Sequence, residues 1–150
     1  MTLNYDCIRD ILLFLEKNLE YTNDPISLEH KRLSINGIID KLSNTYEKTD
    51  IQYSIEKLYE AHYISMPNIK YNNLDYIVSG SIDDITWEGH DFLNNIREKT
   101  IWEATKSGAK KIGVTSISAL SMISMEVVKA ITLNPTVIQK IVDSIPFMRN

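Results

Sequence analysis

Two segments of helical periodicity, followed at once by β-rich sequence, constrain the fold of this chain most strongly. Over residues 34–44 and 49–61, apolar residues recur every three or four positions, which is the spacing of one buried helix face. A turn of about five residues joins the two segments, as in a helix-turn-helix. Two short stretches containing Tyr, Ile and Val follow, with a polar segment between them. They predict a β-hairpin over 63–82.

Two further elements precede this helix pair. Residues 5–19 repeat apolar positions at helical spacing, with charged residues on the opposite face. Residues 26–32 alternate between apolar and polar side chains, which predicts a short strand with one buried face. Helix, strand, two helices and hairpin, in that order, predict a winged helix-turn-helix domain over residues 1–85. The predicted fold class is mainly α with a small β wing.

The remaining residues, 86–150, predict a helical extension. Its helices are expected over 86–111, 116–133 and 135–145, since Gly108 and Gly113 mark the end of the first and an Asn-Pro pair separates the other two. Across the chain, the sequence shows no internal repeat and no low-complexity tract.

The last two helices are more apolar than a helix with one buried face requires. Two explanations fit this composition. The helices either pack on the helix over 86–111, or they form the interface of a homodimer, which is the interpretation we favour. The candidate interface residues are Leu120, Ile123, Val127, Ile131, Ile138 and Ile141.

Two motifs resemble known sequences. Residues 58–64 (LYEAHYI) resemble the end of the recognition helix in winged-helix regulators, with His62 at the position where glycine is usual. Residues 85–93 (ITWEGHDFL) resemble a block of the family called domain of unknown function 2513, found in bacteria and their phages. The likeness extends over about residues 5–105. It implies a winged-helix fold and a phage or prophage setting, and it implies no known activity.

A structural role accounts for each residue of the Thr86–Phe92 block. Thr86 is a good N-cap, and Glu88 lies where the helix dipole favours a negative charge. Gly89 permits close packing, while Trp87 and Phe92 are expected to anchor the helix to the domain.

The sequence gives no sign of an enzyme. Glu88 and His90 are two positions apart on a helix, so they do not face each other as an acid–base pair would. His30, His62 and His90 lie on different elements without metal-ligand spacing. There is no phosphate-binding glycine loop and no nucleophile elbow. Cys7 is expected to be a small buried hydrophobe. We therefore predict no catalytic, cofactor or metal site.

Double-stranded DNA is the partner that the predicted fold favours. In a DNA-binding winged helix, the exposed face of the second helix enters the major groove and cations nearby contact phosphates. Gln52 can read an adenine edge. The candidate contact residues are Gln52, Tyr53, Lys57, Lys48, Lys41 and Lys70, the last on the wing. This reading makes the chain a transcriptional regulator.

The distribution of charge argues for a protein partner instead. Residues 1–85 contain eight Lys and Arg residues against fourteen Asp and Glu residues, and they contain all eight tyrosines of the chain. Residues 49–61 hold one lysine and three acidic residues. Acidic side chains oppose phosphate binding, whereas tyrosine is enriched at protein interfaces. The alternative is thus a protein-interaction module, such as a phage-encoded modulator of a host protein.

Membrane insertion and secretion are not predicted. The first residues lack a basic start followed by an apolar stretch, so they do not form a signal peptide. No apolar run approaches the roughly 20 residues that span a bilayer. A cytoplasmic location is expected.

Overall fold

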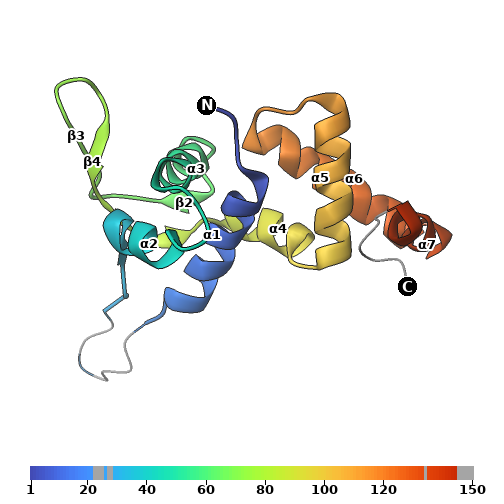
Figure 1. The fold of residues 1–150 in the computed structure, drawn as a ribbon. Coiled ribbons are helices and arrows are strands. Elements are labelled where there is room, and N and C mark those ends of the chain that lie inside the picture. Colours follow the sequence, from blue (N-terminus) through green and yellow to red (C-terminus); the bar gives the residue numbers. More distant parts are fainter. Residues whose placement is uncertain (22–25, 27–28, 134, 145–150) are drawn as a thin grey trace. The chain divides into compact units, whose positions relative to one another are not determined.

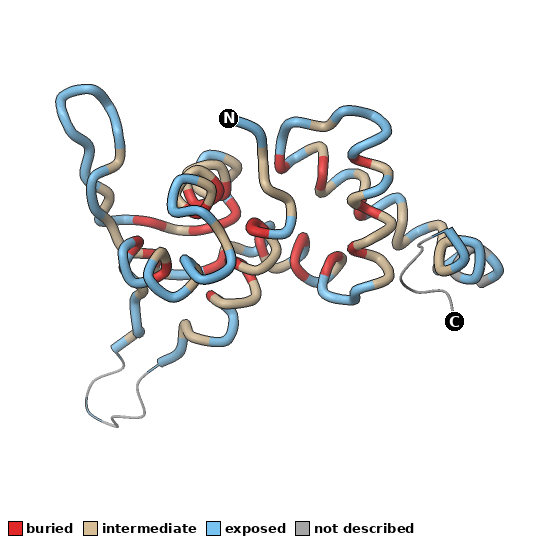
Figure 2. The backbone as a smooth tube through the Cα atoms, in the orientation of Figure 1, coloured by how far each residue is buried: buried red, intermediate tan, exposed pale blue. Residues whose placement is uncertain are grey.

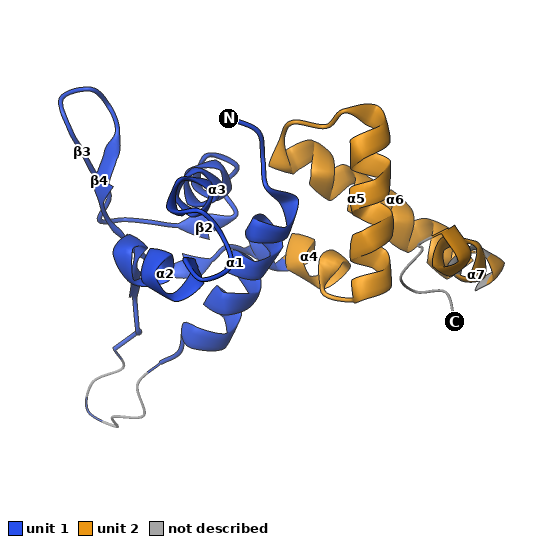
Figure 3. Ribbon diagram, viewed as in Figure 1, with its two compact units in different colours: residues 1–90 blue, residues 91–150 orange. Residues whose placement is uncertain are grey.

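The protein is mainly helical with small two-stranded sheets, as seen in a computed structural model that describes residues 1–21, 26, 29–133 and 135–144 (Figure 1). The chain forms two compact units, residues 1–90 and 91–150, which are coloured separately in Figure 3. This division lies five residues after the predicted boundary. Each unit is described by itself.

Three helices build the first unit: α1 (Tyr5–Asn18), α2 (Ile35–Leu42) and α3 (Lys48–Glu60). Asn4 caps α1 by accepting a hydrogen bond from the amide of Cys7, and Ser34 caps α2 in the same way through Gly37. All three helices begin and end within two residues of their predicted ranges.

The core of the first unit lies where α1 and α2 pack against α3, and it appears in red in Figure 2. Each helix contributes one apolar stripe, so the periodicity in the sequence is also the periodicity of burial. Fully covering an aliphatic side chain of this kind contributes about 1.5–3 kcal/mol. The buried apolar residues of the three helices are Cys7, Ile8, Ile11, Leu12, Leu15, Ile35, Ile38, Ile51, Ile55 and Leu58.

Short antiparallel strand pairs complete the first unit. Strand β1 (Leu33–Ser34) pairs with β5 (Ser81–Ile82), and β2 (Ile64–Ser65) pairs with β6 (Asp84–Ile85). Strands β3 (Lys70–Tyr71) and β4 (Ile77–Ser79) form a hairpin within the predicted range. Its pairing differs from the prediction, because β3 lies in the polar segment expected at the turn, and the β-rich stretch expected as its first strand contains β2, which pairs with β6. Most of this hairpin is exposed (Figure 2).

The first predicted strand is displaced along the chain. It was expected over 26–32, but the strand that pairs with β5 is β1 at 33–34. Within the expected range, His30 makes an isolated antiparallel bridge to Tyr21. Residues 22–25 and 27–28 lie outside the described part of the chain. The alternating pattern therefore did not locate the residues that pair.

Four helices follow: α4 (Trp87–Ile96), α5 (Lys99–Ile112), α6 (Ile117–Leu133) and α7 (Pro135–Ser144). Helix α5 packs mainly on α6, and α7 contacts both. The single helix predicted over 86–111 is wrong, because the chain breaks between α4 and α5. Glu98 caps α5 by accepting a hydrogen bond from the amide of Ile101 at 3.0 Å.

No helix of the described residues has both the length and the apolar character that crossing a membrane requires.

Candidate functional site

The most distinctive surface of the first unit is a small groove between α3 and the β3–β4 hairpin, which we call the α3–hairpin groove. Its volume is about 120 Å³. The lining residues are Glu56, Tyr59, Glu60, Tyr71, Asp75, Tyr76 and Ile77. Three are carboxylates and three are tyrosines, and none of these described lining residues is a cation.

The core of the unit determines which α3 residues reach this groove. Ile51, Ile55 and Leu58 are buried against the neighbouring elements. Because successive helix positions are about 100° apart, Glu56 and Tyr59 must lie away from that stripe. The burial that holds α3 in place therefore also presents its acidic and aromatic side chains.

A side-chain-stabilised turn holds the hairpin side of the groove. The side-chain oxygen of Asn72 accepts hydrogen bonds from the amides of Leu74 at 2.9 Å and Tyr76 at 3.0 Å. The Asn72 amide donates to the Tyr76 carbonyl at 2.9 Å. Asp75 adopts a positive φ of 60°, which aspartate tolerates better than most residues. Tyr71 and Tyr76 thus flank a defined turn.

Two carboxylates of the groove already have partners on α3. The side-chain amide of Gln52 donates to Glu56 at 3.2 Å, and the ammonium of Lys57 pairs with Glu60 at 2.6 Å. The hydrogen bond to Glu60 raises the pKa of Lys57. Lys57 also lies 5.3 Å from the ring centroid of Tyr53. The lysine closest to the centre of α3 is therefore engaged within the helix.

None of the six predicted contact residues lines the groove, although Gln52 and Lys57 contact residues that do. Gln52 joins α3 to the hairpin, since it also donates to the carbonyl of Ile77 at 3.5 Å. It makes these contacts from within α3, whose N-cap is Glu47. The Tyr53 hydroxyl donates to the Met1 carbonyl at 3.4 Å.

The three remaining lysines do not line the groove. Lys41 is exposed near the end of α2, Lys48 is exposed as the first residue of α3, and Lys70 is exposed on β3. None of the seven groove-lining residues was among the predicted contacts; they are Glu56, Tyr59, Glu60, Tyr71, Asp75, Tyr76 and Ile77. The signal for them was the coincidence of acidic residues and tyrosines in the first half of the chain, which does not identify individual positions.

The Thr86–Phe92 block has the expected structural contacts, with one correction. The Thr86 hydroxyl donates to the His62 carbonyl at 2.6 Å and accepts from the Gly89 amide at 3.1 Å. A Cβ on Gly89 would collide with the carbonyl oxygen of Tyr63. Phe92 is buried, but Trp87 is 79% exposed and does not anchor the helix as predicted. A tryptophan at the first position of a helix can point outward even when its neighbours pack.

His62 takes over the glycine's role after α3. Its φ of 62° is the left-handed conformation that usually favours glycine at the end of a helix. The amide of the next residue, Tyr63, donates back to the carbonyl of Leu58 at 2.9 Å, which closes the helix end.

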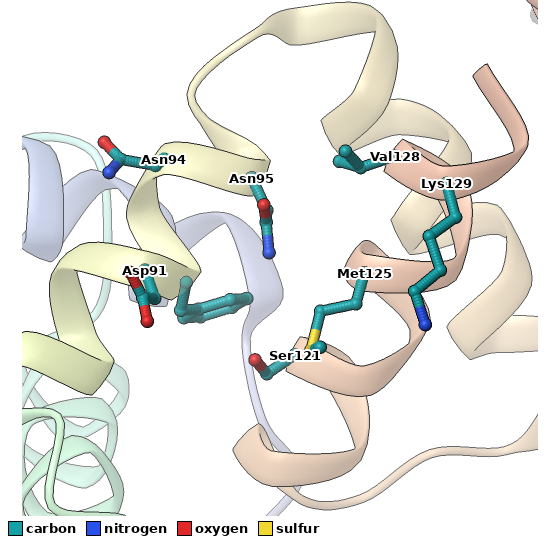
Figure 4. A pocket seen from close by; sticks show the side chains of 8 residues that line it. Asp91, Asn94, Asn95, Ser121, Met125, Val128 and Lys129 are labelled. Atoms are coloured by element: carbon teal, nitrogen blue, oxygen red, sulfur yellow. The ribbon is translucent and has the colours of Figure 1, made fainter. Parts of the chain in front are cut away.

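The second unit contains a larger cavity of about 320 Å³ between α4 and α6 (Figure 4). Phe92, Met125 and Val128 make it partly apolar, whereas Asp91 and Lys129 contribute opposite charges. Figure 4 shows Met125 and Lys129 one turn apart on α6. Nothing in this lining indicates a particular ligand.

The predicted dimer residues have different environments. Leu120 is fully buried within the single chain, so including it in an interface was wrong. Ile123 faces α5, since its Cγ2 lies 3.3 Å from the position of a Cβ on Gly108. Val127, Ile131 and Ile141 are partly exposed, and the side chain of Ile138 lies outside the described residues.

No group of three or more His, Cys, Asp or Glu side chains is placed to hold a metal ion within the described ranges. Cys7 is a buried residue of α1, and burial raises the pKa of its thiol from 9.0 to about 11.

The chain matches the model of a protein family. This family, described as "Hypothetical protein (DUF2513)", matches residues 2–115, which span the first unit from residue 2 onward, α4, α5 and the turn after α5. No match was found among curated proteins or among solved structures.

Proposed function

The chain belongs to the DUF2513 family of hypothetical proteins, and we propose that it is a non-enzymatic binding protein whose first unit has a winged-helix arrangement. The order of α1, β1, α2, α3 and the β3–β4 hairpin supports this arrangement. The pairing of β1 with β5 supports it too, because it places a strand before α2 beside the chain that leaves the hairpin. In this description, α3 is the recognition helix and the hairpin is the wing.

The partner that binds the recognition helix and the wing is a protein. The observation that carries this proposal is the composition of the α3–hairpin groove, in which three carboxylates and three tyrosines lie between the two elements. Phosphate groups would be repelled by these carboxylates. Tyrosine, by contrast, offers a protein partner a large apolar area with a polar end.

Sequence-specific DNA binding is the second candidate, and the helix-turn-helix order of α2 and α3 favours it. Lys41 and Lys48 are exposed beside the turn that joins these helices. Even with Lys70 on the wing, these exposed lysines give little phosphate neutralisation, and Lys57 is already paired with Glu60. Gln52 would have to leave Glu56 and Ile77 in order to read a base. For these reasons DNA ranks second.

Site-specific photocrosslinking in the native cell separates the two candidates. We would place p-benzoylphenylalanine at Tyr76 on the hairpin and, as a matched control, at the exposed Lys17 of α1. The proposal expects a protein adduct from position 76 that is missing from position 17. The adduct is then identified by mass spectrometry, and its binding is measured with purified components. Tyr76→Ala is expected to weaken that binding by about tenfold or more.

A gel-shift titration at low salt gives the opposing outcome. The protein-partner proposal is wrong if the chain binds DNA with a sequence preference at micromolar concentration and if joint replacement of Gln52 and Tyr53 with alanine abolishes that preference. The chain would then be a DNA-binding transcriptional regulator. Circular dichroism of the same variant must show an intact fold.

We further propose that the chain associates with a second copy through α6. Met122, Met125 and Leu133 are exposed on this helix although they are large and apolar. Glu126 and Lys129 lie beside them, 3.5 Å apart. A two-fold interface brings the same patch together from both copies, so this pair of opposite charges is self-complementary.

A further inference from the structure

We propose that the α3–hairpin groove is the receptor for an arginine side chain of the protein partner, with the guanidinium held by the three carboxylates and the three tyrosines. This inference rests on the proposed function, because it names the chemistry that the same surface recognises. Four properties of the groove support it: charge, aromatic lining, size and rigidity.

The charge of the groove selects a cation. Glu56, Glu60 and Asp75 converge on a volume of about 120 Å³. Lys57 compensates one of these charges through Glu60, and Gln52 provides only a neutral donor to Glu56. Two negative charges are therefore left without a cationic counterpart among the residues that line or directly contact the groove. An arriving cation lowers their mutual repulsion.

The aromatic lining selects a delocalised cation over a compact one. Tyr59, Tyr71 and Tyr76 all line the groove, and Tyr71 and Tyr76 are 50% and 64% exposed. A cation over a tyrosine face gains electrostatic attraction from the ring. Guanidinium also stacks on aromatic faces and binds carboxylates through two parallel N–H groups, whereas ammonium does neither.

The size of the groove suits one side-chain head group. Pockets that enclose a whole small-molecule ligand occupy roughly 300–1,000 Å³, and the α3–hairpin groove is smaller at about 120 Å³. A single inserted side chain, with the rest of its segment outside, matches this volume. The groove is thus a specificity pocket within a wider interface.

An apolar side chain lies beside the groove, and the frame of the groove is ordered. Leu74, which precedes the lining residue Asp75 in the hairpin turn, is 73% exposed. Asn72 holds that turn through its side chain, so little conformational entropy remains to be lost on binding. We therefore expect the partner segment to place apolar residues beside its arginine.

Peptide titration followed by ¹⁵N–¹H NMR tests the inference directly. The probes are acetyl-Leu-Arg-Leu-amide, the same peptide with citrulline, and the same peptide with lysine. Citrulline keeps the shape of arginine and removes its charge. We expect arginine to bind about tenfold more tightly than citrulline and more tightly than lysine. The shifted amides should lie in the second half of α3 and in residues 71–77.

Charge-neutralising variants separate a site from general attraction. Glu56→Gln with Asp75→Asn keeps an acceptor for Gln52 and a residue that tolerates positive φ, and it is expected to abolish the arginine preference. Asp40→Asn with Glu20→Gln makes the same change of net charge outside the groove and is expected to preserve it. NMR spectra of both free variants check that the fold is retained.

Several results would overturn the inference. They are equal binding of the arginine and citrulline peptides, no detectable binding of either, shifts that map outside the groove, or equal loss of preference in both double variants. If any of these occurs while position 76 still crosslinks to a protein, the arginine receptor is wrong and the protein-binding function stands. Loss of that crosslink would refute the function itself.

Discussion

Helices α3 and α6 differ in how completely their neighbours cover their apolar residues. In α3, Ile51, Ile55 and Leu58 form one buried stripe, and the outward positions are polar or aromatic. In α6, by contrast, Ile117 and Leu120 are buried, while Met122 is 67% exposed. The apolar residues of α3 are covered within its unit, whereas α6 has more apolar surface than its unit covers. Hydrophobic content alone therefore does not tell how much of a helix is core.

This difference has a functional meaning. The buried face of α3 anchors the helix in the core of its unit. Its outward face can therefore present the acidic and aromatic side chains of the α3–hairpin groove. The outward face of α6 is specialised only in being apolar, which suits contact with an identical surface. The following variants test whether the packing around the two helices differs as much as burial indicates.

A matched pair of glycine substitutions is expected to give the largest contrast. Gly89→Ala places a methyl group against the Tyr63 carbonyl just after α3 and 2.7 Å from Cγ2 of Ile85, so backbone must move. We expect it to lower the free energy of unfolding by about 3 kcal/mol or more. Gly108→Ala meets only Cγ2 of Ile123 on α6, at 3.3 Å. There the helix-propensity gain of up to about 1 kcal/mol offsets the contact.

Urea denaturation of both variants measures the two free energies of unfolding. Comparable losses for Gly89→Ala and Gly108→Ala would mean that packing near α6 is as tight as packing near α3, contrary to the comparison.

Truncation of one apolar side chain on each helix comes next in size. Ile55→Ala opens a cavity in the core of the first unit, and we expect a loss of about 2–4 kcal/mol. Met122→Ala removes an exposed side chain and is expected to change the free energy of unfolding by less than about 0.5 kcal/mol. Both are measured by urea denaturation at low protein concentration, where self-association does not contribute. A loss above 2 kcal/mol for Met122→Ala would refute its exposure.

A pH dependence is expected for the core that α3 shares with α1. Burial raises the pKa of the Cys7 thiol from 9.0 to about 11, and the neighbouring carboxylates Asp50 and Asp10 add to this. The folded state therefore holds the thiol proton more tightly than the unfolded state. The resulting stabilisation is fully present below pH 9 and is lost as the pH rises through 11. Its size is about 2–3 kcal/mol.

Unfolding measured between pH 8 and 11 checks this dependence. Cys7→Ala is expected to make the decline shallower without removing it, because burial and a 2.6 Å hydrogen bond to Asp10 also raise the pKa of Tyr46. Tyr46→Phe should remove that second share. An unchanged slope in Cys7→Ala would show that the thiol titrates alike in the folded and unfolded states.

The sequence predicted the parts of the fold that depend on local periodicity. One-sided apolar spacing located α1, α2 and α3 closely, because that spacing is what buries one face of a helix. The Asn-Pro pair located the boundary between α6 and α7. The break between α4 and α5 was missed because Ile96 and Ile101 continue an apolar pattern across it. The strand before α2 was misplaced because β pairing is decided by a distant partner, Ile82, which local alternation does not reveal.

The sequence predicted which residue types form the candidate site, but it did not predict which individual residues line it. Acidic residues and tyrosines in the first half pointed to a protein-facing surface. The hairpin turn decides which of these acidic residues and tyrosines lie together. Because Asn72 fixes that turn, Tyr71, Asp75 and Tyr76 lie against α3. Lys57 looked like a phosphate contact in sequence, but its neighbour one helical turn away, Glu60, engages it.

Charges placed on the exposed side of α6 are expected to have the smallest effect on the stability of the monomer and still to change its association. Met122→Lys with Met125→Lys leaves the buried residues Ile117 and Leu120 untouched, so the free energy of unfolding at low concentration should change by less than about 0.5 kcal/mol. Placing four like charges in a two-fold interface is costly, so the dimer should dissociate.

Sedimentation equilibrium tests this expectation on three proteins: the methionine variant, the unmodified chain and a serine variant as the control. The serine variant carries Ser107→Lys and Ser118→Lys together, which adds the same charge at other exposed positions of α5 and α6. A concentration-dependent dimer in the unmodified chain and the serine variant, and a monomer in the methionine variant, is the expected result. A monomer in all three would mean that the uncovered apolar surface of α6 does not bind a second copy, and the contrast with α3 would then be one of packing alone.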